Sequence, residues 1–340
     1  MQITESMDQF RLKWLDVVRA LGAFLVVLAH VEYSGKGNGI VTDFYFILTR
    51  TAVPLFFMAS GFLLLSKSES YLDFFKKRAL KVFVPFLIWS VIYLVWQHES
   101  LDQSFLTILK TYFIKILRGP RANHLWFFYE LFGLYLFTPI LRLFGQKAET
   151  KDLFYFFGIW FLLTPVANLL QEFTPVEIGV EYYFLNGYIG YFIFGYLAGR
   201  LQFTRPHKLI AAAVFLVSLI VTLTGFYLFK LYNIKSEYLG SYLSVNIVLL
   251  STSLFVMFTK LNVSDKVYPM VSLLSRTSFG VYLAHVLVMS VFFSIPLFSS
   301  LSFMGSAIYM VPLLGLLSYV LSLLLIVVLQ KIPILKYIVP

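Results

Sequence analysis

Long runs of apolar residues, separated by short polar segments, recur along the whole chain. We expect each run to form a helix of about 20 residues, the length that crosses the hydrocarbon core of a bilayer. Ten runs are found, at about 14–33, 44–65, 82–98, 124–144, 152–170, 182–199, 208–229, 239–259, 272–295 and 305–329. The pattern predicts an all-α polytopic membrane protein with about ten transmembrane helices around a polar central cavity, in one domain spanning residues 1–340.

Composition agrees with this fold class. Hydrophobic residues make up 59% of the chain and charged residues only 13%, whereas a soluble chain needs more charge to cover its surface. The chain has no cysteine, which excludes disulfides, cysteine metal ligands and a thiol nucleophile.

Basic residues predict the orientation in the membrane. If the N-terminus is cytoplasmic, about two thirds of the 27 Lys and Arg fall on the inner side, as the positive-inside rule expects. The sequence therefore predicts a multi-pass protein of the cytoplasmic membrane with both termini inside. The net charge of +10 then needs no nucleic acid partner.

The first predicted helix carries Asp16, Arg19 and His30. Arg19 and His30 are eleven residues apart, which places them on one helix face about 16 Å apart along the axis, and Asp16 can pair with Arg19 at i,i+3. Ionisable groups inside an apolar span face a protein interior or a wet cavity, so we predict a polar stripe lining a passage, with Asp16, Arg19 and His30 as catalytic residues together with Glu130 of the fourth predicted helix. The alternative is that Asp16 and Arg19 lie at the interface and His30 caps the helix.

His30 is the first candidate for catalysis. An imidazole exchanges protons near neutral pH, and a neutral one can accept a hydroxyl proton as general base. Its predicted place near the outer end of the first helix would let it meet a substrate that arrives from outside.

A basic group precedes the third predicted helix. Lys77, Arg78 and Lys81 lie on the inner side, with Arg78 and Lys81 at i,i+3 on one predicted face. Two cations at the membrane–cytosol boundary suit a diphosphate or nucleotide phosphate. Ordinary anchoring by inner positive charges is the alternative.

The fourth predicted helix opens with His124 and Trp126 at the outer face, and Glu130 lies two turns further in. We predict His124, Trp126 and Arg50 as substrate-binding residues. A buried acid needs a cationic partner or a proton, and Arg50 is predicted at a depth that would let it pair with Glu130. The alternatives are that Trp126 belongs to an interfacial belt and that Glu130 forms a structural rather than a catalytic ion pair.

Two further helices carry polar or helix-breaking residues. In the second, Pro54 predicts a kink and Ser60-Gly61 a close helix approach. In the ninth, Tyr282 and His285 lie at i,i+3, and we interpret His285 as a core histidine satisfied by hydrogen bonds.

The longest loop, 98–123, is predicted on the outer side. Apolar residues recur there at helical spacing, with Lys110, Lys115 and Arg118 between them. This predicts an amphipathic helix lying on the outer surface, or one that dips between helices as part of a substrate groove.

Two absent motifs narrow the function. No glycine-rich nucleotide loop and no paired-histidine zinc helix is present. These absences argue against ATP-driven transport by this chain alone, and we expect no metal.

Taken in order, these motifs resemble the membrane-bound acyltransferase-3 family, which includes bacterial O-acetyltransferases of surface polysaccharides. The resemblance rests on Asp16 with Arg19-x10-His30, Val53-Pro54-Leu-Phe-Phe-Met-Ala-Ser60-Gly61, the basic pair leading to Pro85-Phe-Leu-Ile-Trp89, His124-Leu-Trp126-Phe, and Phe279-Gly280-Val-Tyr282-Leu-Ala-His285.

The resemblance implies that the protein takes an acyl group, acetyl in the first instance, from cytoplasmic acyl-CoA. The acceptor would be a hydroxyl on the outer side, on a saccharide or lipid-linked saccharide. The arginine and histidine required in the family correspond to Arg19 and His30. The family's Arg-x-x-Arg motif is here Arg78-x-x-Lys81, in which lysine keeps the charge but loses bidentate geometry.

Two other functions stay open at this point. The same polar passage could export a polysaccharide or a lipid-linked precursor, or the chain could be a non-catalytic scaffold of an envelope-synthesis complex.

Overall fold

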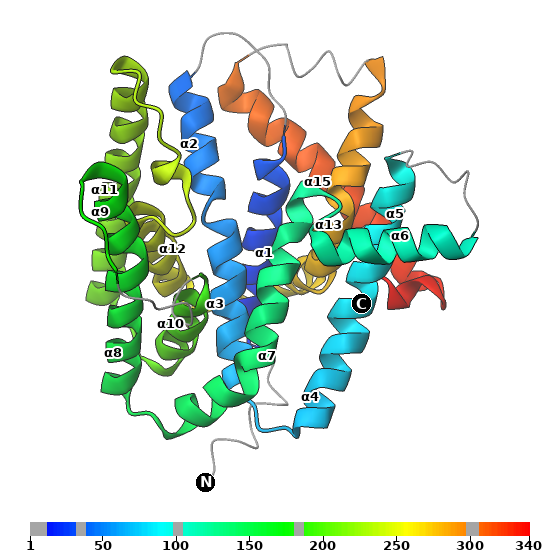
Figure 1. Cartoon of the computed structure of the whole chain (residues 1–340), viewed down its shortest axis with the longest axis horizontal. Helices are drawn as coiled ribbons and strands as arrows, with labels where there is room; N and C mark the ends of the chain where they lie inside the picture. Colours follow the sequence, from blue (N-terminus) through cyan, green and yellow to red (C-terminus); the bar gives the residue numbers. More distant parts are fainter. Residues whose placement is uncertain (1–11, 32–38, 98–104, 180–186, 297–305) are drawn as a thin grey trace. The chain divides into compact units, whose positions relative to one another are not determined.

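The computed structural model describes residues 12–31, 39–97, 105–179, 187–296 and 306–340. These residues form helices and connecting segments with no strand among them (Figure 1), which confirms the predicted all-α class. The elements are α1 (Lys13–Ala29), α2 (Gly39–Thr49), α3 (Ala52–Leu65), α4 (Tyr71–Arg78), η1 (Ala79–Phe83), α5 (Val84–Trp96), α6 (Phe105–Arg118), η2 (Asn123–Leu125), α7 (Trp126–Lys147), α8 (Thr150–Phe161), η3 (Leu162–Val166), α9 (Ala167–Phe173), α10 (Ile189–Arg200), α11 (Arg205–Leu231), η4 (Tyr238–Gly240), α12 (Val245–Phe258), α13 (Tyr268–Phe293), α15 (Ala307–Lys331) and η5 (Leu335–Tyr337).

Within the described residues, eight helical spans are long and apolar enough to cross a membrane. They are Gly39–Leu65, Tyr71–Trp96, Asn123–Lys147, Thr150–Phe173, Arg205–Leu231, Tyr238–Phe258, Tyr268–Phe293 and Ala307–Lys331. The protein is therefore a polytopic membrane protein. The other two predicted spans correspond to shorter helices, the 17-residue α1 and the 12-residue α10, and parts of both predictions, 32–33 and 182–186, lie outside the described residues.

The chain divides into two compact units. The first consists of the described residues of Met1–Leu25, Asp43–Leu63 and Glu149–Ser278, and the second of those of Val26–Thr42, Leu64–Ala148 and Phe279–Pro340. Helices α1 and α13 each contribute residues to both units.

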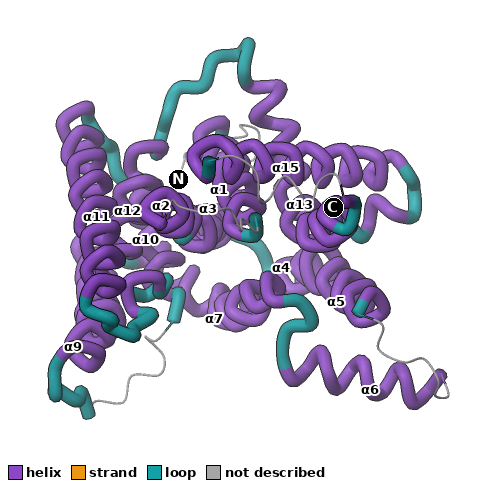
Figure 2. The backbone as a smooth tube through the Cα atoms, turned by 90° about the horizontal axis from the view of Figure 1, so that it is seen from above, coloured by secondary structure: helices purple, strands orange, loops and turns teal. Residues whose placement is uncertain are grey.

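In the first unit, α11 lies along α12 (Figure 2). Ile47, Leu219, Ile247 and Leu250 form a buried cluster between α2, α11 and α12. The predicted close approach at Ser60-Gly61 is confirmed, because a Cβ on Gly61 would lie 1.8 Å from the Phe192 carbonyl oxygen of α10.

The break in the second predicted helix precedes Pro54. Helix α2 ends at Thr49 and α3 begins at Ala52, so Pro54 lies in the first turn of α3, where its missing N–H costs nothing. The prediction of a proline kink inside one helix was therefore wrong in position: the interruption falls at Arg50 and Thr51.

In the second unit, the third predicted helix begins earlier than expected, at Tyr71 rather than at residue 82. Ser70 caps it, accepting a hydrogen bond from the Asp73 N–H at 3.1 Å, and the helix continues through the π-helical turn η1 into α5. Pro85 explains the wide turn, because a proline lacks an N–H and crowds the carbonyl four residues before it.

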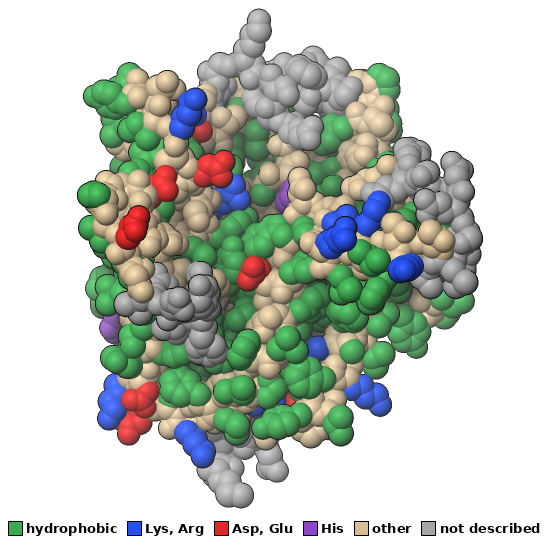
Figure 3. Space-filling view, in the orientation of Figure 1, with side chains coloured by type: hydrophobic (Ala, Val, Ile, Leu, Met, Phe, Trp, Pro, Cys, Tyr) green, Lys and Arg blue, Asp and Glu red, His purple; other side chains and the backbone are tan. Residues whose placement is uncertain are grey.

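Helix α6 packs against α5, crossing it in Figure 1 and lying beside it in Figure 2. It falls within the segment predicted to be an amphipathic helix, of which residues 98–104 are outside the described part. Lys and Arg side chains gather over α6, whereas the visible face around α7 is mainly apolar with one acidic group on it (Figure 3). Exposed apolar side chains on a membrane helix suit contact with lipid.

Candidate active site

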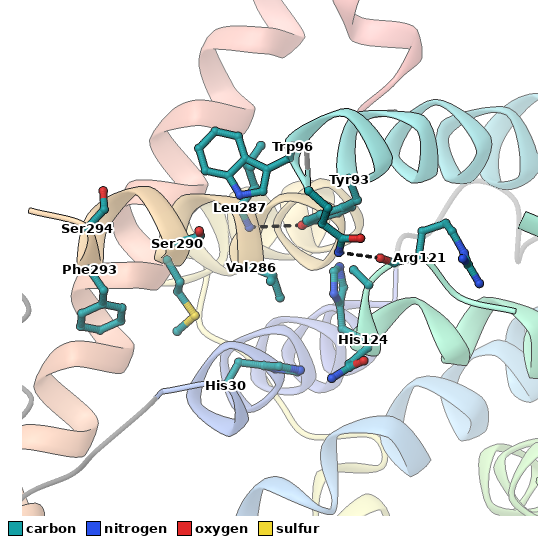
Figure 4. Close-up of a pocket in the computed structure, with 14 residues that line it drawn as sticks. His30, Tyr93, Trp96, Arg121, His124, Val286, Leu287, Ser290, Phe293 and Ser294 are labelled. Atoms are coloured by element: carbon teal, nitrogen blue, oxygen red, sulfur yellow. Dashed lines mark hydrogen bonds between the residues drawn. The ribbon is translucent and has the colours of Figure 1, made fainter. Parts of the chain in front are cut away.

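The second unit contains a cavity of about 730 Å³, a size typical of small-ligand sites. Four elements line it, namely the end of α1 with His30, the end of α5, the residues that lead into α7, and the last turns of α13 (Figure 4). The lining residues are His30, Tyr93, Trp96, Gln97, Arg121, Ala122, Asn123, His124, Val286, Leu287, Met289, Ser290, Phe293 and Ser294.

His30 follows the last residue of α1 and points toward His124 (Figure 4). Its Nδ1 lies 2.8 Å from the Val26 carbonyl oxygen. Since a carbonyl only accepts hydrogen bonds, we infer that Nδ1 carries the proton, and in the neutral ring the basic lone pair is then on Nε2. The structure thus places the predicted general base on the wall of a cavity.

His285 lies behind His30 and is fully buried. Its Nδ1 lies 2.7 Å from the Tyr282 carbonyl oxygen, and its Nε2 lies 3.3 Å from Nδ1 of His30. The prediction of a core histidine satisfied by backbone agrees with the first contact. The second contact, to another imidazole, was missed.

His124 completes a cluster of three imidazoles. Its ring centroid lies 4.9 Å from that of His285 and 6.0 Å from that of His30. The side chain is 2% exposed. Neither ring nitrogen makes a hydrogen bond of ordinary geometry to a described residue, although the Leu283 backbone lies close enough to interact with the ring. Buried polar groups are normally paired, so we expect a group bound in the cavity to provide a hydrogen-bond partner for a ring nitrogen of His124.

Two tyrosines fix the part of α13 that carries His285. The Tyr282 hydroxyl donates to the His124 carbonyl. The Tyr93 hydroxyl donates to the Leu283 carbonyl at 2.8 Å and accepts from the Leu287 N–H at 3.2 Å. These contacts join α5 and the start of α7 to α13 on either side of His285.

Asp16 and Arg19 lie in the first unit. The buried Asp16 carboxylate accepts hydrogen bonds from Ser275 and, at 2.9 Å, from Tyr268. Arg19 donates to the Ser278 hydroxyl at 3.3 Å. The structure thus places both residues of α1 against the first turns of α13, and their catalytic roles stay predictions.

The remaining predicted site residues do not line this cavity. Glu130 is exposed on α7, and Trp126, the first residue of this helix, is half-buried. Arg50 belongs to the first unit, where its guanidinium lies 4.2 Å from the ring centroid of Phe46 and 4.9 Å from that of Tyr242. Its pairing with Glu130 stays a prediction.

The basic residues of α4 and η1 differ in exposure, and their binding of one phosphate ligand stays a prediction. Arg78 is half-buried over the rings of Phe74 and Tyr135, at 5.4 Å and 5.9 Å, whereas Lys81 is exposed. Lys81 lies within the π turn η1, which begins directly after Arg78 and is wider than an α turn, so the i,i+3 spacing differs here from that of a regular α-helix.

Lys77 is held in an ion pair that the sequence did not reveal. Its ammonium lies 2.9 Å from the Glu69 carboxylate, which also contacts Arg142 at 3.2 Å. Burial of the Glu69 carboxyl opposes its ionisation, but the hydrogen bond from Lys77 and the two cations hold its pKa below the usual value. Nothing in the sequence around Arg142 indicates this partner, because Glu69 lies 73 residues away along the chain.

Among the described residues, no group of three His, Asp or Glu side chains is arranged to hold a metal ion. The histidines instead contact backbone carbonyls and one another.

The family model described as an acyltransferase domain matches residues 12–331 of the chain. Searches of curated proteins and of solved structures find no match. Because the family match extends over nearly the whole chain, this polytopic membrane protein belongs to the acyltransferase-3 family of acyltransferases.

Proposed function

We propose that the protein is an O-acyltransferase of the cytoplasmic membrane that transfers an acetyl group from acetyl-CoA to a hydroxyl of an extracytoplasmic or lipid-linked saccharide. The single observation that carries this proposal is His30 on the cavity wall, with Nδ1 held by the Val26 carbonyl. That contact leaves Nε2 as the basic nitrogen, which general base catalysis of hydroxyl attack requires.

The chemistry follows from this tautomer. Nε2 of His30 takes the proton of the acceptor hydroxyl as its oxygen attacks the thioester carbonyl. The new C–O bond forms, the C–S bond breaks, and the proton passes from His30 to the leaving thiolate of CoA. In this scheme His124, buried and without a hydrogen bond of ordinary geometry from its ring to the described residues, hydrogen-bonds the bound substrates.

Arg78 and Lys81 are the residues we assign to the phosphates of the donor. The Nε atom of Arg78 is buried without a hydrogen-bond partner among the described residues, while Lys77 is engaged by Glu69. Fifteen residues of helix separate Arg78 from Tyr93 on the cavity wall, or about 22 Å at the rise of an α-helix. The donor would therefore reach the cavity with its pantetheine arm extended along α5.

The charge distribution supports the membrane orientation in this proposal. With both termini in the cytoplasm, Arg78 and Lys81 face the side that supplies acyl-CoA, and the cavity at the end of α5 faces the outer side. Lipids and a saccharide acceptor are then the partners, with no nucleic acid.

The test is transfer of labelled acetyl from acetyl-CoA to a lipid-linked saccharide fraction by purified protein in nanodiscs. We expect His30→Ala to lower turnover by about 10² to 10⁴-fold, the usual contribution of a general base. The matched control is His207→Ala, since His207 is exposed near the start of α11. Turnover that survives His30→Ala, or export of the saccharide with no dependence on acetyl-CoA, would contradict the proposal.

A further inference from the structure

The strongest feature outside the proposed chemistry is the contact between His30 and His285. His30 lines the cavity, whereas His285 is 0% exposed and lies behind it. A residue in that place does not touch a substrate, so any effect on transfer must pass through its neighbours, and His30 is the one whose ring nitrogen it contacts.

Contacts with two backbone carbonyls identify the nitrogen of His285 that can accept a hydrogen bond from His30. Nδ1 of His285 lies 2.7 Å from the Tyr282 carbonyl and 3.2 Å from that of Val281. Both oxygens can only accept, so Nδ1 carries the proton and Nε2 carries the lone pair. That lone pair faces Nδ1–H of His30 at 3.3 Å, which gives this proton a second acceptor besides Val26.

The rings that pack around His30 and His285 belong to residues that carry no formal charge. His124 packs against both rings, and Tyr93 packs against His124. No Asp or Glu is among the described residues that line the cavity, and Arg121 is the one cation there. When His30 takes a proton, the lone pair of His285 is therefore the side-chain acceptor placed against its Nδ1–H.

We propose that His285 is a positioning residue for His30. It fixes the ring so that Nε2 faces the cavity, and it stabilises the imidazolium by accepting from Nδ1–H. A neutral imidazole does this without the cost of burying a carboxylate. The catalytic part of this inference rests on the proposed function, whereas the hydrogen bond itself does not.

Two substitutions separate positioning from folding. In His285→Asn the shorter amide can still donate to the Tyr282 carbonyl but does not reach His30. In His285→Gln the longer side chain places an amide oxygen near the site of Nε2. Because hydrogen bonds to charged groups are the stronger ones, we expect His285→Asn to lower kcat about tenfold or more with an unchanged KM for acetyl-CoA. His285→Gln should stay within a few-fold of wild type. Equal kcat values for the two variants would overturn the inference.

A second measurement does not depend on turnover. In protein labelled with ¹⁵N-histidine in nanodiscs, we expect the His30 Nδ1–H signal to shift in His285→Asn and to return toward its wild-type position in His285→Gln. An unchanged signal in both variants would overturn the inference even if acetyl transfer is observed. Conversely, the expected shifts in a protein that transfers no acetyl would refute the proposed function and leave the His285 contact standing.

Discussion

The contact of α3 with α10 in the first unit offers a sharp test of packing. Gly61 of α3 faces the backbone of α10 at Phe192, and Gly195 of α10 faces the backbone of α3 at Met58. A Cβ on Gly61 would lie 1.8 Å from the Phe192 carbonyl oxygen, and one on Gly195 would lie 1.9 Å from that of Met58, whereas ordinary contact begins at 3.4 Å. The two helices therefore meet backbone to backbone, as small residues allow in membrane proteins.

Gly61→Ala should be strongly destabilising. Overpacking in a core costs about 1 to 3 kcal/mol when side chains can shift. Here the obstacle is backbone, so two helices must separate and we expect the upper end of that range or more. The higher helix propensity of alanine returns about 1 kcal/mol, which leaves a net loss of about 2 kcal/mol or more.

Gly158→Ala in α8 is the matched control, because nothing lies within 4 Å of a Cβ at that position. Thermal melting of the purified variants in detergent, followed by tryptophan fluorescence, should place Gly61→Ala several degrees below wild type and Gly158→Ala at or above it. If both alanine variants melt alike, the close approach of α3 and α10 is wrong.

Three further results are expected from the second unit. Tyr93→Phe removes the donor to the buried Leu283 carbonyl and should cost about 1 to 3 kcal/mol, measured as a lower melting temperature; an unchanged one would refute the contact. Because the pKa of the Glu69 carboxyl is lowered in the folded protein, the stabilisation that its ion pair contributes is fully present above the ordinary pKa of 4.5 and is lost as the pH falls through the folded pKa. When the pH is lowered, the melting temperature should therefore fall less in Glu69→Gln than in the wild-type protein. An equal fall in both proteins would count against the ion pair. Arg78→Ala should raise the KM for acetyl-CoA about tenfold or more, while Lys77→Ala, whose ammonium is paired with Glu69, should change it much less; the reverse order would reassign the phosphate site.

Most of the helices could be predicted because they depend on apolar runs and on turn-forming residues, which are local features of the sequence. Eight spans and the close approach at Gly61 follow from such local features. The start of α4 was missed because Tyr71–Arg78 is polar enough to look like a loop, although Ser70 caps it. The break before Pro54 was displaced for a related reason, since a proline affects the turn that precedes it rather than its own position.

The histidine cluster shows where sequence reasoning ends and packing begins. His30, His124 and His285 are on three elements separated by 94 and 161 positions, and no spacing rule joins them. Each alone resembles a different ordinary residue, a helix cap, an interfacial group or a core histidine. Tyr93 and Tyr282 join α5 and the start of α7 to α13, which fixes His124 and His285, and His30 meets this pair through its contact with His285. Those contacts place one imidazole on the cavity wall, a second buried behind it and a third beside it that makes no hydrogen bond of ordinary geometry to the described residues. Two tyrosines that carry no catalytic signal of their own therefore fix two of the three imidazoles, and their loss should displace His124 and His285 as well as weaken the fold.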